Sequence, residues 1–391
     1  MHRIKENALF LIDGSYILYR SYYGLRPLYT SDGTPTQATY GFCRTIKVLI
    51  DKFDPKNLVL VWDSKGKTFR SEVYEEYKAT RQAPPSDLFI QKEQIQKFAK
   101  AIGLCQVSQT GYEADDLIAS LVKQNKKGQS IIVGPDKDLY QLISDKDVMI
   151  YDSFNDKMTD EYDFRKERGF GPEKLRFYHS LLGDASDNIP GVRGIGKKGA
   201  EELVKKFDSL QDLYKNLDKV KTERMRNALI ENKDNAFLSH KLFGLETYKL
   251  DLKKSDLKFN KKNWINAAPI FKKLEFKSLL KDLEKNFGVK DLALKLTEKN
   301  KKQEKEIEVK KPKIEVSKDI KEIQTIIDFD NKTKTTKDDW VCKIITSQED
   351  LKDLISKLKK EKEFAFDTET EGLRPLQDNV LGLSISFDKK K

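Results

Sequence analysis

The chain has 391 residues, enough for two or three domains with a sizeable hydrophobic core. Charged residues make up 35% of it and the net charge is +11, which favours a polyanionic partner, although a lysine-rich proteome produces the same figure. The three cysteines lie far apart without a CxxC pair, which excludes a disulfide framework and fits a reducing compartment. The first apolar run is too short for a signal peptide, and no run has transmembrane length. We therefore expect a cytoplasmic protein without a membrane partner.

Three short apolar runs, each closed by an aspartate or by a turn that contains one, are the first predicted elements. They cover residues 8–12, 58–62 and 130–133 and are separated by segments with helical periodicity. Short continuous apolar runs of this kind predict a parallel sheet that is covered by helices on both faces. Ligands of such sheets bind beyond the carboxyl ends of the strands.

Nine carboxylates fall in five clusters, most of them at the predicted strand ends. Two hard cations need many oxygen ligands, so this pattern indicates a magnesium site. The alternative is structural at each cluster taken alone, because Asp before Gly is a common turn residue and acids in a first helical turn are common caps. Five clusters at one sheet edge would repel one another unless cations neutralised them, which favours the metal interpretation. The acids are Asp13, Asp63, Glu113, Asp115, Asp116, Asp136, Asp138, Asp184 and Asp187.

Two of these clusters have a predicted helical setting. The acids at 113–116 precede a run with amphipathic periodicity, so we expect them in the first turn of a helix, where backbone N–H groups favour negative charge. Asp184 and Asp187 are three residues apart, which predicts that they share one helical face.

Residues 69–81 form a segment of a different character. Helical spacing would place Tyr74, Tyr77, Lys78 and Arg81 on one face of a helix that Pro84 and Pro85 terminate. A face that mixes tyrosines with cations suits a single nucleic-acid strand. A solvated helix with two tyrosines packed on the body of the protein explains the pattern equally well.

Residues 189–200 are rich in glycine and cations and precede an amphipathic helix. Glycines permit close backbone approach, and N–H groups at a helix start bind phosphate. The segment nearly spells a nucleotide P-loop, but Lys198 occupies the Ser/Thr position and no strand precedes it, so we reject an ATPase. We expect a hairpin between two helices that holds a duplex backbone without reading its sequence.

The motifs LIDGSY, VWDSKGKTFR, YKATR, GYEADD, VGPDKDL and LLGDASDNIPGVRGIGKKGA occur in this order. Together they resemble the flap endonuclease family, in particular the N-terminal 5′ nuclease domain of bacterial DNA polymerase I, over about residues 5 to 290. Two departures, Gly199 where relatives usually carry Thr and Gln37 where many carry Gly, touch no expected metal ligand.

The resemblance implies an α/β fold with a PIN-like parallel sheet, helices on both faces, a helical arch and a helix-three-turn-helix subdomain. The expected divisions are a catalytic domain at 1–175 with the arch at about 69–100, a DNA-binding helical subdomain at 176–290, a charged linker at 291–337, and the opening of an RNase H-like 3′–5′ exonuclease domain at 338–391.

The resemblance also implies site residues and cofactors. The nine acids would hold two Mg²⁺ ions, with Mn²⁺ as a substitute, and K⁺ would bind at the helix-three-turn-helix. We expect the tighter ion at Asp13, Asp63, Glu113, Asp115 and Asp136, the looser one at Asp138, Asp184 and Asp187, and Asp116 shared through water, so that Asp116→Asn should abolish cleavage while DNA binding persists. Substrate contacts near the scissile phosphate would come from Arg20, Arg70, Lys78 and Arg81, and further DNA contacts from Tyr74, Tyr77, Gly191, Arg193, Gly194, Gly196, Lys197 and Lys198.

The C-terminal part resembles the start of the 3′–5′ proofreading domain, whose first metal motif Asp367 and Glu369 match. We expect strands at 340–346, 364–366 and 381–387 and a helix at 351–358. Two carboxylates cannot complete a two-metal site, so we predict no exonuclease activity and only partial stability there. A truncated gene or an incomplete sequence would account for this ending.

The predicted activity is that of a magnesium-dependent 5′–3′ exonuclease and 5′-flap endonuclease, acting in RNA primer removal and excision repair as the N-terminal part of a DNA polymerase I. We expect a nucleoid-associated monomer whose substrates are flaps, nicks, 5′ ends and primer junctions. The alternative is a catalytically silent DNA-binding fragment of such a polymerase. A haloacid-dehalogenase-type phosphatase is disfavoured because Ser15 stands where a second Asp is needed, and His2, His179 and His240 give no support to a histidine triad.

Overall fold

The computed structural model describes residues 3–287 apart from 65, 127, 145 and 146, together with 354–358, 365–370 and 380–386. The chain divides into two compact units, residues 1–302 and 303–391. Within these described ranges, no helix is both long and apolar enough to cross a bilayer.

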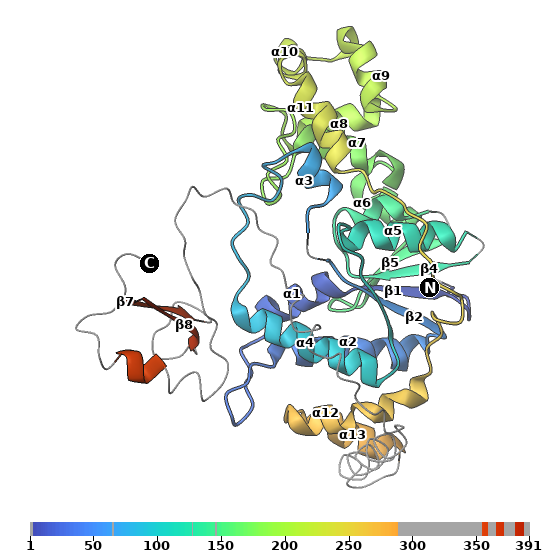
Figure 1. Cartoon of the computed structure of the whole chain (residues 1–391). Coiled ribbons are helices and arrows are strands. Elements are labelled where there is room, and N and C mark those ends of the chain that lie inside the picture. Colours follow the sequence, from blue (N-terminus) through green and yellow to red (C-terminus); the bar gives the residue numbers. More distant parts are fainter. Residues whose placement is uncertain are drawn as a thin grey trace, which may run out of the picture. The chain divides into compact units, whose positions relative to one another are not determined.

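A six-stranded sheet forms the centre of the first unit's described part (Figure 1). Its spatial order is β3-β2-β1-β4-β5-β6, and only the edge pair β5–β6 is antiparallel. The strands are β1 (Leu9–Asp13), β2 (Asn57–Val61), β3 (Cys105–Val107), β4 (Ser130–Val133), β5 (Val148–Asp152) and β6 (Lys157–Thr159). The three predicted strands are therefore confirmed as the central β1, β2 and β4, whose apolar residues are buried on both faces.

Helices cover both faces of this sheet (Figure 1). One face packs Phe10, Leu60 and Trp62 against α1 (Gly14–Gly24), α2 (Gln37–Phe53), α4 (Ser86–Ala101), α12 (Ala268–Lys273) and α13 (Lys277–Phe287). The other face packs Leu11, Val59 and Ile132 into a core with α5 (Ala114–Gln124), α6 (Glu161–Arg168), α7 (Leu175–Leu182), α8 (Lys197–Lys206), α9 (Leu210–Lys215), α10 (Glu223–Glu231) and α11 (Lys233–Leu242). Short 3₁₀ turns lie at Leu139–Leu142, Pro172–Lys174, Leu217–Lys219 and Lys261–Ala267.

The strand order creates the ligand crevice. From β1 the chain continues outward through β2 and β3 and then returns to pair β4 with the other side of β1. Neighbouring connections therefore leave β1 and β4 in opposite directions, which opens a crevice beyond their carboxyl ends. Asp13 is the last residue of β1, and Asp136 follows β4.

The predicted helix at 69–81 is wrong beyond its first turn. Helix α3 covers only Phe69–Val73, because Tyr74 is extended and Lys78 has a φ of +59°. Tertiary contacts override the helical spacing here: the Lys78 N–H donates to the Asp187 carbonyl rather than to its own helix. Helix α4 begins after the two prolines as expected, and it buries Leu88, Ile95 and Phe98 in the core.

The acids at 184 and 187 do not share a helical face, which corrects that prediction. Helix α7 ends at Leu182, and residues 184–189 form a turn closed by reciprocal backbone hydrogen bonds between Asp184 and Ile189. Gly191 packs its backbone against Gly183, where an added Cβ would lie 2.4 Å from the Gly183 nitrogen. The glycine segment then runs to α8 as a connection between helices, as predicted.

The described part of the second unit consists of a helical segment at 354–358 and an antiparallel pair, β7 (Ala365–Thr370) and β8 (Val380–Ser386). Positions 367 and 369 lie within β7 rather than behind it, since the strand is longer than the expected 364–366. The predicted strand at 340–346 and the linker at 291–337 lie outside the described residues.

Candidate active site

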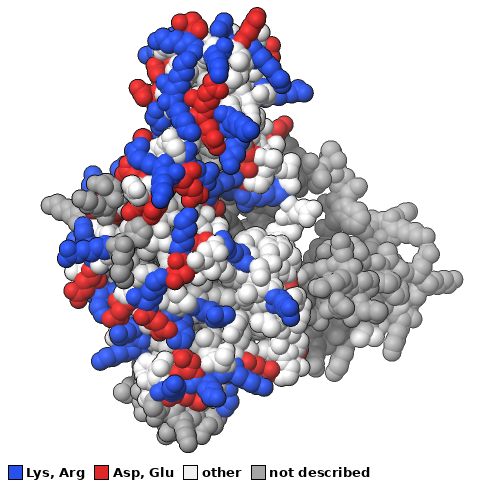
Figure 2. Space-filling view, turned by 180° about the vertical axis from the view of Figure 1, so that it is seen from behind, with Lys and Arg blue, Asp and Glu red and all other residues white. Residues whose placement is uncertain are grey.

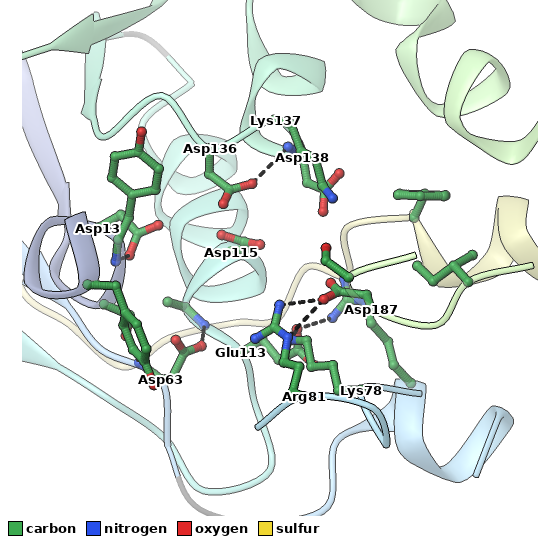
Figure 3. A pocket seen from close by; sticks show the side chains of 18 of the residues that line it. Asp13, Asp63, Lys78, Arg81, Glu113, Asp115, Asp136, Lys137, Asp138 and Asp187 are labelled. Atoms are coloured by element: carbon green, nitrogen blue, oxygen red, sulfur yellow. Dashed lines mark hydrogen bonds and ion pairs between the residues drawn. The ribbon is translucent and has the colours of Figure 1, made fainter. Parts of the chain in front are cut away.

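A cavity of about 990 Å³ lies where the sheet's carboxyl edge meets α1 and the turn after α7 (Figure 3). It brings together acids from distant parts of the chain, which is what the sequence predicted for the strand ends. The acids that line it are Asp13, Asp63, Glu113, Asp115, Asp136, Asp138 and Asp187.

Three of these acids form the tightest group. One oxygen each of Asp115, Asp136 and Asp138 lies within 4.8 Å of the others. Asp115 stands in the first turn of α5, as predicted, whereas Asp136 and Asp138 follow β4. Asp138, which was expected at the looser ion, therefore lies close to Asp115 and Asp136, which were expected at the tighter ion.

Burial and mutual repulsion disfavour the simultaneous ionisation of these three carboxyl groups when no cation is bound. Burial, followed by the charges of Asp136 and Asp13, raises the pKa of Asp115 well above its usual range. Burial and the charge of Asp136 likewise raise the pKa of Asp138 to about 7. Carboxylates forced together in this way gain stability from a cation or from protons.

Three lining acids also accept backbone hydrogen bonds, which gives them structural roles of the general kind that the alternative interpretation proposed. An oxygen of Asp13 accepts from the Tyr16 N–H at 2.9 Å and caps α1. An oxygen of Asp63 accepts from the Ala114 N–H at 2.8 Å, and one of Asp136 accepts from the Asp138 N–H at 3.0 Å. Each of these hydrogen bonds uses one oxygen of the carboxylate. The structural interpretation and the metal interpretation of these acids are therefore compatible.

Cations from the segment after α3 reach the opposite side of the cavity (Figure 3). The Lys78 ammonium donates to Glu113 at 2.9 Å, and the Arg81 guanidinium donates through Nε to Asp187 at 2.9 Å. Burial disfavours the charge of Glu113, yet Lys78 and then Arg70 lower its pKa below the ordinary value. Lysine and arginine side chains are thus positioned among the acids, as expected for substrate contacts.

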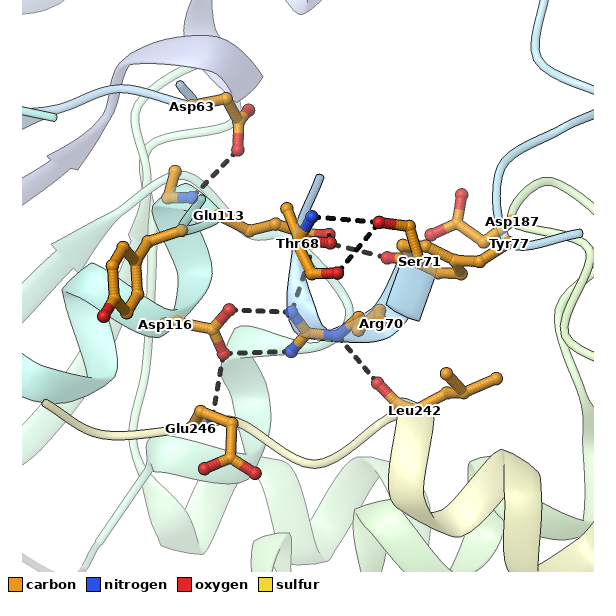
Figure 4. A network of polar contacts seen from close by, with 12 residues as sticks. Asp63, Thr68, Arg70, Ser71, Tyr77, Glu113, Asp116, Asp187, Leu242 and Glu246 are labelled. Carbon is orange, nitrogen blue, oxygen red and sulfur yellow. Dashed lines mark hydrogen bonds and ion pairs between the residues drawn. The ribbon is translucent and has the colours of Figure 1, made fainter. Parts of the chain in front are cut away.

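Asp116 and Arg70 form a buried ion pair at the edge of the cavity (Figure 4), and this pair gives both residues a structural role beside the expected ones. Asp116 is 1% exposed, does not line the cavity, and accepts two hydrogen bonds from Arg70, at 2.7 and 3.0 Å, and one from the Glu246 N–H. Arg70 is 4% exposed and also donates to the carbonyls of Leu242 and Gly244. Arg70 also lines the cavity and lies 3.5 Å from Glu113, so the pair joins α3, α5 and the chain at the end of α11 directly beside the acids.

Asp184 also lies outside the residues that line the cavity. It forms an ion pair with Lys137, which does line it. Burial opposes ionisation of Asp184, but the hydrogen bond from Lys137 lowers its pKa. Sequence reasoning missed Lys137, although its place between Asp136 and Asp138 was a signal.

The two tyrosines expected to stack on bases have structural contacts. Tyr77 is 9% exposed, packs with Ile189, Leu242 and Phe243, and donates to Glu113 at 3.2 Å. The Tyr74 hydroxyl donates to Glu76. Tyr77 is therefore packed on the body of the protein, as the alternative expected, but it is not part of a helix and it also lines the cavity.

The glycine segment exposes most of its predicted contacts. Gly191 is buried and donates its N–H to Ser239, so it closes the loop instead of facing a ligand. The cations and outer glycines are exposed, and no side chain caps the start of α8, which leaves N–H groups of its first turn available. The exposed residues are Arg193, Gly194, Gly196, Lys197 and Lys198.

Helix α1 supplies the remaining side of the cavity. Arg20 lines it as expected, donates to the Tyr16 hydroxyl at 2.7 Å and lies over the Phe154 ring. Tyr19 and Tyr23 also line it, and no motif had singled them out. Their spacing with Tyr16 along one helical face was the available signal.

The donor set fits hard divalent cations. Among the described residues that line the cavity there are seven carboxylates and no cysteine or histidine. Magnesium and manganese prefer such oxygen ligands, whereas zinc sites are usually built with cysteine or histidine.

Family models match three stretches of the chain. Residues 8–169 match the N-terminal resolvase-like domain of the 5′-3′ exonuclease, and residues 170–264 match the C-terminal SAM fold of the same family. Residues 342–391 match a 3′-5′ exonuclease model.

Curated relatives agree with these matches. The chain is 38% identical over 283 residues to a 5′-3′ exonuclease of Aquifex aeolicus, an alignment that covers 72% of this chain and 96% of that protein. It is 34% identical over 387 residues to DNA polymerase I of Borreliella burgdorferi, covering 97% of this chain but only 40% of the polymerase.

Solved structures share the fold at low identity. A T5 5′-exonuclease with bound zinc is 20% identical, with a TM-score of 0.51, and the match covers 71% of this chain and 99% of that one. A bacteriophage T5 flap endonuclease with DNA and metal ions is 19% identical, with a TM-score of 0.52, covering 71% and 98%. These similarities place the chain's fold among flap nucleases.

Proposed function

The chain belongs to the 5′-3′ exonuclease family, whose members hydrolyse DNA phosphodiester bonds, and from this premise we propose that its acidic cavity is a magnesium-dependent 5′–3′ exonuclease and 5′-flap endonuclease site. The observation that carries the proposal is the convergence of seven carboxylates, from five separate stretches of sequence, on one cavity at the sheet's switch point.

We propose that Asp115, Asp136 and Asp138 hold the first divalent ion, because their oxygens are the closest group. Asp13, Asp63, Glu113 and Asp187 line the same cavity and would complete this site and a second one. Divalent ions bound there would lower the pKa of an attacking water and neutralise charge on the phosphate. Mn²⁺ shares the preference for oxygen ligands, so we expect it to substitute for Mg²⁺.

The chain's own cations would orient the scissile phosphate. Lys78 and Arg81 end among the acids, where their N–H groups can donate to phosphate oxygens and stabilise the charge that grows during hydrolysis. Arg20 lies at the same cavity on α1. Arg70 also lines the cavity, but we do not extend this role to it, because it is 4% exposed and its N–H groups donate to Asp116 and to two carbonyls.

Duplex DNA would lie on the exposed hairpin before α8. The free N–H groups of that helix start and the side chains of Arg193, Lys197 and Lys198 suit backbone phosphates. Figure 2 shows Lys and Arg side chains over much of one face, interleaved with Asp and Glu, so net charge alone does not locate the DNA surface. K⁺ at the hairpin stays a prediction that rests on the family resemblance.

The similarity to 5′-3′ exonucleases and DNA polymerase I supports a proposal for the biological setting. This chain spans 40% of the length of the Borreliella DNA polymerase I, whose polymerase activity is a property of that protein. We propose that the substrates are 5′ flaps, nicks, 5′ ends and RNA primer junctions met in replication and excision repair. We also propose that the chain acts as a cytoplasmic, nucleoid-associated monomer.

The test is cleavage of an end-labelled 5′-flap DNA by the purified chain, resolved on a denaturing gel with Mg²⁺ or with chelator. We expect magnesium-dependent release of the flap near the junction. Asp115→Asn should abolish release while the gel-shift affinity for the same DNA persists. If the folded wild-type chain binds the flap DNA but does not cleave it with Mg²⁺ or Mn²⁺, the chain is the catalytically silent binding fragment.

A further inference from the structure

An exposed tyrosine at the outer end of α1 has no role in the proposed chemistry. Tyr23 lines the acidic cavity, yet it is 66% exposed to solvent. Building on the proposed flap nuclease function, we propose that Tyr23 is a stacking platform for a base of the unpaired 5′ strand where that strand passes the rim of the site. The stacking role expected for Tyr74 and Tyr77 thereby moves to a different helix.

The direction of α1 leads from the acids to this ring. The helix begins at Gly14, directly after Asp13, and Tyr23 follows ten residues after that acid. A rise of 1.5 Å per residue separates the two positions by about 15 Å along the helix axis. Tyr16, Arg20 and Tyr23 all line the cavity, so one helical face connects the acids with the outer tyrosine.

Neighbouring rings hold Tyr23 in place. The Tyr22 ring meets it edge-on, with centroids 4.9 Å apart and an interplanar angle of 81°. Tyr22 is itself anchored, because its hydroxyl donates to Asp87 of α4 at 2.7 Å. The Tyr19 ring lies 6.4 Å from Tyr23 on the preceding turn. A ring held in this way loses little conformational entropy when a base stacks on it.

Cations for the phosphates lie along the same cavity. Arg20 follows from the same helix, and Arg81, which is 53% exposed, enters from the segment after α3. Single-strand sites combine aromatic rings for bases with cations for the backbone, and they tolerate any sequence because every base has a π-face. The rim around Tyr23 has both components.

The occupant that fits best is a single strand. A paired base in a duplex hides both faces in the stack, so a lone ring at the rim could reach only a terminal base pair. A protein partner needs roughly 800 Å² of its own surface, far more than one tyrosine offers. An unpaired base matches the size of one ring, and the proposed substrate delivers such bases at this cavity.

The experiment is steady-state cleavage of 5′-flap DNA by wild-type, Tyr23→Ala, Tyr23→Trp and Tyr162→Ala chains. Tyr162 is the matched control, since it is 73% exposed on α6 and does not line the cavity. We expect Tyr23→Ala to raise KM about tenfold with little change in kcat, because base–aromatic stacking contributes at substrate binding. Tyr23→Trp and Tyr162→Ala should keep the wild-type KM.

An abasic scan of the flap identifies the stacked base. One abasic nucleotide is placed at each unpaired position in turn. At one or two positions it should raise the wild-type KM to the value of Tyr23→Ala. At the same positions it should not change the KM of Tyr23→Ala. Equal KM values for wild type and Tyr23→Ala on every flap would refute the platform. A loss in Tyr23→Ala that persists at every abasic position would assign it to a contact other than stacking.

A binding measurement separates this inference from the proposed function. With 2-aminopurine in the unpaired strand and chelator present, stacking on Tyr23 should quench the fluorescence of the wild-type complex more than that of Tyr23→Ala. If wild type fails to cleave but shows this difference, the nuclease proposal fails and the platform stands. If wild type cleaves and quenching is equal in both chains, only the platform fails.

Discussion

Asp115 and Asp116 are adjacent acids with opposite expected effects on stability. Asp115 lies among like charges in the cavity, whereas Asp116 is 1% exposed and bonded to the buried Arg70. The perturbation is the isosteric change of each to asparagine, studied without divalent ions at pH 8. Asp116→Asn removes the carboxylate nearest to the buried Arg70 charge and leaves only Glu113, at 3.5 Å, as an acidic partner, which costs about 3–5 kcal/mol.

These free energies translate into opposite shifts of the melting temperature. For a chain of this size 1 kcal/mol corresponds to roughly 2–3 °C, so Asp116→Asn should lower the Tm by about 6–15 °C. Asp115→Asn removes a buried charge whose pKa is raised, and each unit of elevation corresponds to about 1.4 kcal/mol. The metal-free Asp115→Asn chain should therefore melt a few degrees above the wild type, on the order of 3 °C per unit.

The assay is differential scanning fluorimetry with a Mg²⁺ or Mn²⁺ titration. Metal bound by the native state raises the Tm, so wild type and Asp116→Asn should show that rise and Asp115→Asn should lose most of it. The reasoning is refuted if Asp116→Asn melts within 2 °C of the wild type and loses the metal response, because Asp116 would then be a metal ligand, as the family resemblance first implied.

Three further outcomes are expected. Lys78→Ala should slow single-turnover flap cleavage by on the order of 100-fold, because a hydrogen-bond donor to the phosphate is lost. The control is Lys97→Ala, which removes an exposed lysine paired with Glu93 and should cleave at the wild-type rate. Equal cleavage rates for the two variants would contradict the role of Lys78. Gly191→Ala should lower stability to urea by roughly 1–3 kcal/mol or more because of its φ of +63° and its close packing, whereas Gly196→Ala, with open space around it, should not. Burial, followed by the charge of Lys137, lowers the pKa of His179 to about 4, so its contribution to stability is complete above pH 6.5 and is lost as the pH falls towards 4, at up to about 1.4 kcal/mol per unit. His179→Gln should flatten the urea stability profile over that range, and an unchanged slope would contradict the assignment.

Local patterns in the sequence were sufficient to predict the centre of the sheet and the acids that meet at its edge. The runs at β1, β2 and β4 are apolar on both faces, which only a covered parallel sheet requires, and strands of such a sheet deliver their ends to one edge. Asp13, Asp115 and Asp136 therefore met in space as predicted. The short edge strands β3 and β6 have three residues each and carry too little periodicity to be recognised.

Positions whose environment comes from distant contacts could not be read from spacing. Residues 74–81 have helical periodicity, yet hydrogen bonds to the turn at Asp187 and to Glu113 hold them in another conformation. Asp116 and Asp115 differ by one step along α5, and one residue corresponds to about 100° of rotation around a helix. That rotation turns one carboxylate into the cavity and the other towards Arg70.

The sequence by itself determined which chemistry this protein carries, because oxygen ligands, cations and glycines are properties of residue type, and their order along the chain identified the family. The tertiary structure decided which member of each cluster performs which role. The direction of a side chain depends on its tertiary contacts. Arg70 and Tyr77 turn inward because buried acids and carbonyls bind them. Tyr23 stays at the rim, where it packs against the ring of Tyr22, which is itself bonded to Asp87.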